Sequence, residues 1–121
     1  LHIEGERMKQ DMKQDWPKDE TGELLRLMQE QADDLSLPRD IDFFLIFETR
    51  DEAIAFVNQA DLGHEFRVDT SRYEKTSKWQ ARLTAHLIPV HAEIVMLEKQ
   101  VARLGREYGG EPDGWGCAPA P

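Results

Sequence analysis

The sequence of 121 residues has a single cysteine, no long apolar run and few basic side chains. One cysteine, Cys117, cannot form a disulfide within the chain, which suits a reducing compartment. No apolar stretch approaches the roughly 20 residues that a membrane-spanning helix needs, and no basic segment precedes a signal-like apolar region. We therefore expect a cytoplasmic protein with no membrane partner.

The sequence also lacks the motifs of common catalytic and cofactor sites. Its glycines form neither a dinucleotide-binding fingerprint nor a phosphate-binding loop. His86 and His91, with Glu93 nearby, do not have the i, i+4 spacing of a helical zinc pair, so we interpret them as ordinary surface residues. Cys117 has no histidine near it in sequence, and no carboxylate pair lies in an apolar-pocket pattern. We predict no enzymatic activity, no cofactor and no metal site.

Negative charge dominates, because 24 acidic side chains against 15 lysines and arginines give a net charge of -9. The whole excess lies in residues 1–70. Binding to nucleic acid depends on basic side chains that neutralise phosphates, so we expect no direct nucleic-acid partner. The acidity would attract a basic protein segment, or would serve only to keep the protein dissolved. One basic cluster with interleaved aromatic residues could stack on RNA, although a solvated loop is the interpretation we favour. It comprises Arg72, Tyr73, Lys75, Lys78, Trp79 and Arg82.

Apolar spacing predicts three helices and four strands, because helices repeat about every 3.6 residues and strands about every two. Two boundaries carry extra signals: Thr49 and Glu52 form a capping box, and Pro89 suits the first turn of a helix. The expected elements, in order, are a helix over 19–35, a strand over 41–47, a helix over 49–63, a strand over 65–69, a strand over 79–87, a helix over 89–108 and a strand around Trp115.

This order, α followed by βαββαβ, predicts an α+β fold. Two crossover helices with a hairpin between them give a ferredoxin-like antiparallel sheet with both helices on one face, plus an extra N-terminal helix. We expect a flexible arm over 1–18 whose first residues resemble an expression remnant, a single domain over 19–117 and a short tail over 118–121. The residues predicted to form the core are Phe44, Ile46, Phe56, Leu83, Ile94, Leu97 and Val101.

The segment 108–117 is rich in glycine and contains one large aromatic side chain. Gly109–Gly110 would end the long helix, and Asp113–Gly114 has the composition of a turn. Trp115 then lies on a short extended strand. There it would either cover the core or contact a partner, as tryptophan often does at interfaces.

This C-terminal segment resembles that of the RraB family, regulators of ribonuclease E, which carries a helix, a glycine-rich break and then D-G-W-G. Asp113–Gly116 has this sequence here, and the strand 42–47 with the helix after it has the family's order, so the resemblance covers roughly residues 38–117. It implies a non-enzymatic regulator that inhibits or modulates ribonuclease E, and so RNA degradation, by binding the enzyme's non-catalytic scaffold. The familiar regulator also has an acidic tail, whereas residues 118–121 are uncharged.

The residues expected to bind the partner come from two sources. The resemblance implies Asp113, Gly114, Trp115 and Gly116. Negative charge near the second predicted helix adds Asp51, Glu52 and Asp61, which is our own inference. An alternative interpretation is a small-ligand or dimerisation module of ferredoxin-like fold that uses its uncovered sheet face. A dimer with a pocket between sheets would favour that alternative, and the sequence allows both a monomer and a homodimer.

Overall fold

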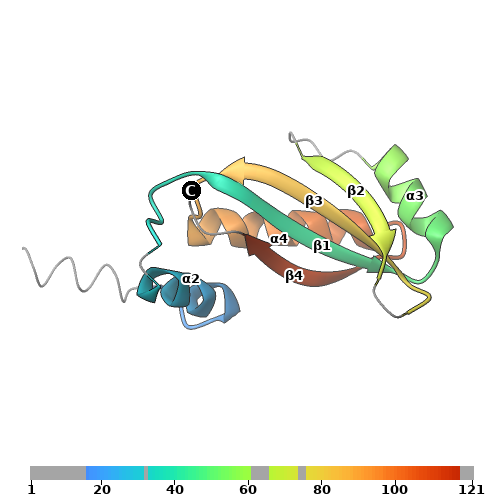
Figure 1. The fold of residues 1–121 in the computed structure, drawn as a ribbon. Coiled ribbons are helices and arrows are strands. Elements are labelled where there is room, and N and C mark those ends of the chain that lie inside the picture. The colour runs from blue at the N-terminus through green and yellow to red at the C-terminus, as the bar shows by residue number, and fades with distance from the viewer. Residues whose placement is uncertain (1–15, 32, 61–65, 74–75, 118–121) are drawn as a thin grey trace, which may run out of the picture.

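The computed structural model describes residues 16–31, 33–60, 66–73 and 76–117 (Figure 1). Within them, a four-stranded antiparallel sheet has the strand order β2-β3-β1-β4. The elements are α2 (Glu20–Glu30), β1 (Arg39–Phe47), α3 (Arg50–Gln59), β2 (Arg67–Arg72), β3 (Trp79–Leu87), α4 (His91–Arg106) and β4 (Glu111–Cys117). The predicted α+β class and the predicted order of elements are confirmed.

Local signals explain where the helices begin and end. Asp19 caps α2 by accepting a backbone hydrogen bond at 2.7 Å. Thr49 and Glu52 form the predicted capping box at the start of α3, with both of its hydrogen bonds at 3.2 Å. Gly109 follows α4 with a φ of 87°, a backbone conformation that favours glycine at a helix end.

Most boundaries differ from the prediction by a few residues, and two of the differences have a visible cause. Helix α2 ends at Glu30, because the Asp34 carboxylate accepts hydrogen bonds from the backbone and the hydroxyl of Ser36, which holds the following segment in a turn. Strand β2 spans Arg67–Arg72 and not 65–69, because it pairs with β3 as far as Trp79. Pairing with a long neighbouring strand therefore outweighs the polar composition of this segment.

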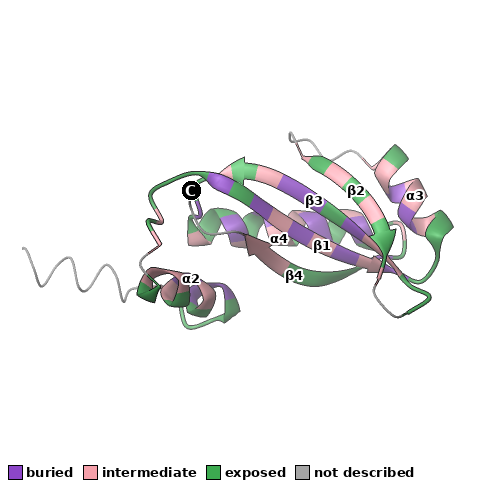
Figure 2. Cartoon of the chain, in the orientation of Figure 1, coloured by how far each residue is buried: buried purple, intermediate pink, exposed green. Residues whose placement is uncertain are grey.

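Alternate residues of β1 point to opposite sides of the sheet, and one side forms the core (Figure 2). The Phe47 ring centroid lies 5.5 Å from that of Phe56 in α3, and Leu45 lies against Gly105 in α4. Both crossover helices therefore cover the same face of the sheet, as predicted. The apolar side chains of β1 on this face are at most 1% exposed, and they are Ile41, Phe43, Leu45 and Phe47.

The prediction that Phe44 and Ile46 belong to this core is wrong. Both residues lie on the opposite side of β1 and are partly exposed, and we call this side of the sheet the open face. A shift of one residue moves a side chain to the other face of a sheet, and the unbroken apolar run over 43–47 does not indicate which set faces inward. Five of the predicted residues do belong to the core cluster, namely Phe56, Leu83, Ile94, Leu97 and Val101.

Helix α2 lies outside the βαββαβ unit and packs beside α4, near the end of β4 (Figure 1). Its Leu25 is fully buried in the common core. Two polar contacts fix its first turn on α4: Asp19 lies 3.0 Å from His91, and the Thr21 hydroxyl lies 3.4 Å from a Glu98 carboxylate oxygen. The extra helix therefore extends the helical layer and leaves the open face uncovered.

Candidate functional site

The open face presents rows of side chains that the strand registers align across the sheet. Phe44 of β1 lies beside Arg82 of β3, which in turn lies beside Asp69 of β2. The other rows are His86 with Asp40; Arg67, Thr84, Asp42 and Gly116; and Ser71, Gln80, Ile46 and Glu111. Since both crossover helices pack on the other side, none of the described helices covers this face.

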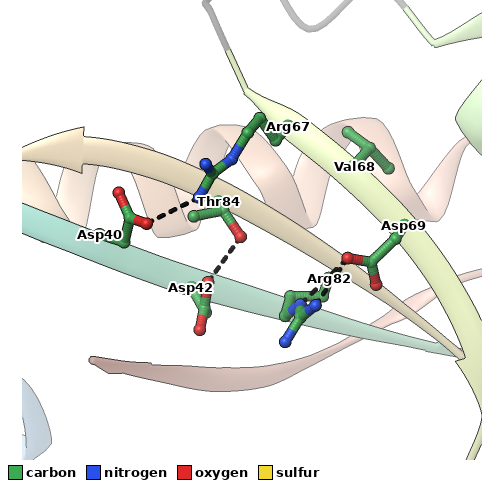
Figure 3. Close-up of a pocket in the computed structure, with 7 residues that line it drawn as sticks. All are labelled: Asp40, Asp42, Arg67, Val68, Asp69, Arg82 and Thr84. Carbon is green, nitrogen blue, oxygen red and sulfur yellow. Dashed lines mark hydrogen bonds and ion pairs between the residues drawn. The ribbon is translucent and has the colours of Figure 1, made fainter. Parts of the chain in front are cut away.

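A hollow of about 290 Å³ lies on the open face, around Thr84 (Figure 3). Thr84 is only 8% exposed although it lies on the side away from the core, because longer charged side chains surround it. The lining residues are Asp40, Asp42, Arg67, Val68, Asp69, Arg82 and Thr84. With charged residues predominating, the hollow differs from the mostly apolar pockets that bind small organic ligands.

Most charges around the hollow neutralise one another. Arg67 donates to Asp40 at 2.7 Å, and Arg82 donates to Asp69 at 2.8 Å. The His86 ring lies 2.9 Å from the second oxygen of Asp40. The hydrogen bonds from His86 and from Arg67 lower the pKa of Asp40, and the hydrogen bond to Asp69 raises the pKa of Arg82.

Two carboxylates on the open face accept no hydrogen bond from a basic side chain among the described residues, although the charge of Asp42 helps to raise the pKa of the nearby Arg82. Asp42 accepts a hydrogen bond from the neutral Thr84 hydroxyl at 2.6 Å, and Glu111 is exposed at the start of β4. Neither carboxylate forms an ion pair within the part of the chain that the structure describes. Asp42 lies two residues before Phe44 on β1, and Glu111 of β4 lies beside Ile46, two residues after Phe44. Phe44, which is partly exposed, therefore lies between the two carboxylates along the strand direction.

The predicted partner-binding segment Asp113–Gly116 forms most of the edge strand β4. Phe43 pairs with Trp115 and Leu45 pairs with Pro112, so two residues of β4, Asp113 and Gly114, lie opposite the single residue between them. This β-bulge depends on Gly114, whose φ is 87°. The segment therefore borders the open face beside Phe44.

Trp115 itself points to the core side of the sheet, because it pairs with Phe43. Its ring packs against the core cluster, and it is only partly exposed. The indole N–H donates to the Thr21 hydroxyl oxygen at 3.0 Å, which joins β4 to α2. Both predicted functions of Trp115 remain proposals, but its polar edge already has a partner within the chain.

Two of the acidic residues predicted near the second helix, Asp51 and Glu52, lie beyond the Phe47 end of β1. Asp51 is exposed in the first turn of α3, beyond the Phe47 end of β1 and away from Trp115. Glu52 is partly exposed and serves in the capping box, where its carboxylate also lies against Gly109. Asp61 falls outside the described residues.

The remaining candidate side chains have structural partners. His86 contacts Asp40 and His91 contacts Asp19, so the two histidines belong to separate hydrogen-bonded pairs. Residues 16–31, 33–60, 66–73 and 76–117 include no cluster of His, Cys, Asp and Glu that could hold a metal ion. Burial raises the pKa of the Cys117 thiol, which makes the reactive thiolate scarcer.

Sequence reasoning missed one buried charge, Arg39 at the start of β1. Its side chain is 3% exposed and forms an ion pair with Asp33 at 2.6 Å. It also donates to the carbonyl oxygens of Asp34 at 2.7 Å and Leu37 at 3.2 Å, so it holds the segment that leads into β1. The signal was its position two residues before Ile41, on the core side of the strand.

Comparison with known proteins places this fold in a family. The family described as RraB, regulator of ribonuclease activity B, matches residues 18–117. The chain belongs to the RraB family. No match to a curated protein was found.

Membership of the RraB family indicates the general function of this domain. The family regulates ribonuclease activity and is not a catalytic family, which agrees with the expectation of a non-enzymatic protein that acts on a ribonuclease. The match begins before α2 and ends with β4, so the family region includes the extra helix as well as the βαββαβ unit. Among the described residues, no helix has the length and apolar character needed to cross a membrane.

Proposed function

We propose that this RraB-family chain regulates ribonuclease E by binding a basic segment of the enzyme's non-catalytic scaffold. The observation that carries the proposal is the family match over residues 18–117. The net charge of -9 supports a basic partner, because complementary charge accelerates and orients protein association. By occupying such a segment, the chain would alter RNA degradation without touching RNA. It would do so in the cytoplasm.

The proposed contacts are the residues named from the sequence: Asp113, Gly114, Trp115 and Gly116 of β4, together with Asp51, Glu52 and Asp61. Asp113 and Asp51 are exposed, so they can attract a basic partner. Because Asp113 lies opposite the middle of β1 and Asp51 lies beyond its Phe47 end, a single partner segment would have to follow the β4 side of the sheet to reach both. The exposed part of Trp115 would supply apolar contact close to Asp113.

We also propose that residues 19–117 form a ferredoxin-like domain. Read from the β4 edge, the strand order is β4-β1-β3-β2, and each neighbouring pair is antiparallel. The crossover helices α3 and α4 share one face, as two split βαβ units with the usual handedness require. An uncovered sheet face is the natural consequence of this arrangement.

The proposal can be tested by RNA cleavage with two forms of ribonuclease E. One form retains the non-catalytic scaffold, and the other contains only the catalytic domain. The purified chain should change cleavage by the first form and leave the second unaffected. Equal effects on both forms would mean that the chain does not act through the scaffold, and no effect on either would reject ribonuclease E as the target.

The partly exposed Phe44 and Ile46 on the open face favour a second candidate function, a dimerisation module. Light scattering on the purified chain distinguishes the two. A concentration-dependent dimer that excludes the ribonuclease scaffold would support the second function, whereas a monomer that binds the scaffold supports the first.

A further inference from the structure

We propose that the open face docks an extended arginine-bearing segment of a protein partner, with the pattern arginine, any residue, apolar residue, any residue, arginine. The apolar residue would lie over Phe44, and the two arginines would pair with Asp42 and Glu111. The choice of partner rests on the proposed function, and the surface and its chemistry are argued from the following observations.

Charge complementarity selects a basic segment. The carboxylates of Asp40, Asp42, Asp69 and Glu111 lie on this face against the guanidinium groups of Arg67 and Arg82. The two guanidinium groups donate to Asp40 and Asp69, so Asp42 and Glu111 remain for a partner. Both arginines of the face are therefore occupied, which disfavours binding of RNA phosphates.

Strand geometry sets the spacing of the partner's arginines. Asp42 precedes Phe44 by two residues, and Glu111 pairs with Ile46, which follows Phe44 by two residues. At about 3.3 Å per residue, the two carboxylates are separated by about 13 Å along the strand. Residues i and i+4 of an extended segment have the same separation and point the same way, with residue i+2 between them.

Glycines leave the β4 side of this surface bare. Gly116 lies beside Asp42 in the register, and a Cβ atom added to it would meet no atom within 4 Å. Its φ is not in the left-handed region, so neither packing nor backbone conformation requires glycine there. A Cβ on Gly114 would also meet nothing within 4 Å. The missing side chains give a partner segment access to Asp42 and to Phe44.

The partner would lie across the face and not add as a strand along the β4 edge. Pro112 has no backbone N–H to offer at that edge, and the bulge at Gly114 interrupts the regular spacing of hydrogen-bonding groups. Arginine fits the face better than lysine, because a planar guanidinium can donate two parallel hydrogen bonds to a carboxylate.

The test is a titration of the isotopically labelled chain, followed by amide NMR shifts, with a synthetic peptide that contains Arg-Thr-Val-Thr-Arg. A control peptide has the same composition with its two arginines adjacent, and single-stranded RNA is a third ligand. The first peptide should shift the amides of Asp42, Phe44 and Gly116 and should bind more tightly than the control. Equal binding of the two peptides, shifts confined to α2 or α3, or a matching response to RNA would overturn the proposal. Shifts that change when the protein alone is diluted would instead assign the face to a second copy.

Three variants sharpen the result. Gly116→Val should keep the fold, since the added side chain enters open space, and should abolish the peptide-induced shifts by blocking the face. Asp42→Asn should weaken binding about two- to fivefold, as loss of an exposed ion pair does. Glu107→Gln, an equal charge change at the exposed C-cap of α4 in the helical layer, should leave peptide affinity unchanged.

The same variants separate this inference from the proposed function. If the ribonuclease E scaffold binds the wild type and Gly116→Val equally well, the docking surface is wrong and the proposed function stands. If the scaffold does not bind at all but the peptide binds as expected, the surface stands and ribonuclease E is the wrong partner.

Discussion

Substitution of two adjacent phenylalanines tests which side of β1 is the core. Phe43 is 1% exposed, and its ring meets that of Phe66 edge-on with centroids 6.2 Å apart. Phe43→Ala should therefore cost ~3–5 kcal/mol of unfolding free energy, the range found for buried Phe-to-Ala changes. Phe44 is partly exposed on the open face, so Phe44→Ala should cost about 1–1.5 kcal/mol, roughly half the value of fully burying such a side chain.

Urea unfolding followed by circular dichroism measures both losses. A domain of this size has about 5–15 kcal/mol of stability, so Phe43→Ala should remain measurable while shifting the midpoint far more than Phe44→Ala. The denaturant slope should stay the same in both variants, which would show that the unfolded state is unchanged. Equal losses, or a larger loss for Phe44→Ala, would refute the assignment of the two faces.

Three further predictions concern the helical layer. Leu97→Ala should cost ~2–5 kcal/mol in the same urea assay, because Leu97 is 3% exposed in the core; a loss below about 1 kcal/mol would contradict its placement. Trp115→Phe should cost about 1 kcal/mol and loosen α2, because it removes the indole donor to Thr21; unchanged amide exchange in α2 would show that this hydrogen bond is not needed. Burial raises the pKa of Glu98 above its usual 4.5, so the folded state favours the protonated form. The stability that protonated Glu98 contributes is present below the pKa of the unfolded chain and is lost as the pH rises through the pKa of the folded chain. Glu98→Gln should consequently be more stable than the wild type at neutral pH, and the advantage should disappear in acid; an advantage independent of pH would have another origin.

The sequence predicted those features of the fold that depend on neighbouring residues. The capping box at Thr49 and Glu52 is local, and the spacing of Ile94, Leu97 and Val101 reports one face of one helix. These signals need no knowledge of the partner elements. For the same reason they gave the correct order of strands and helices along the chain.

Features that depend on distant pairing were not predicted. Thr21 and Trp115 are 94 residues apart in sequence, so their hydrogen bond has no local signal. The bulge opposite Phe44 appears only when the registers of β1 and β4 are compared. The residues of β1 that face the core could, by contrast, have been predicted. Asp42 is two residues from Phe44, so both side chains point to the same side of the strand, and a charged side chain marks that side as the outer one.

The binding role of Asp113–Gly116 stays a prediction, and the structure adds two carboxylates beside this segment that the sequence did not single out. Asp113–Gly116 does border an uncovered surface, yet the carboxylates left without ion pairs there are Asp42 and Glu111. Sequence reasoning overlooked both, because a carboxylate is recognised as unpaired only after the strand registers have assigned Arg67 and Arg82 to other partners.

The central claim is that this acidic domain binds a basic segment of ribonuclease E. Biolayer interferometry with the immobilised non-catalytic scaffold tests it most directly, at about 0.15 M and about 1 M salt, where charges are screened within ~8 Å and ~3 Å. We expect binding at the lower salt, with a slower association at the higher salt. Asp51→Asn and Asp113→Asn together should lower the association rate more than they raise the dissociation rate. Absence of scaffold binding at the lower salt, or tight and salt-sensitive binding to single-stranded RNA alone, would contradict the account.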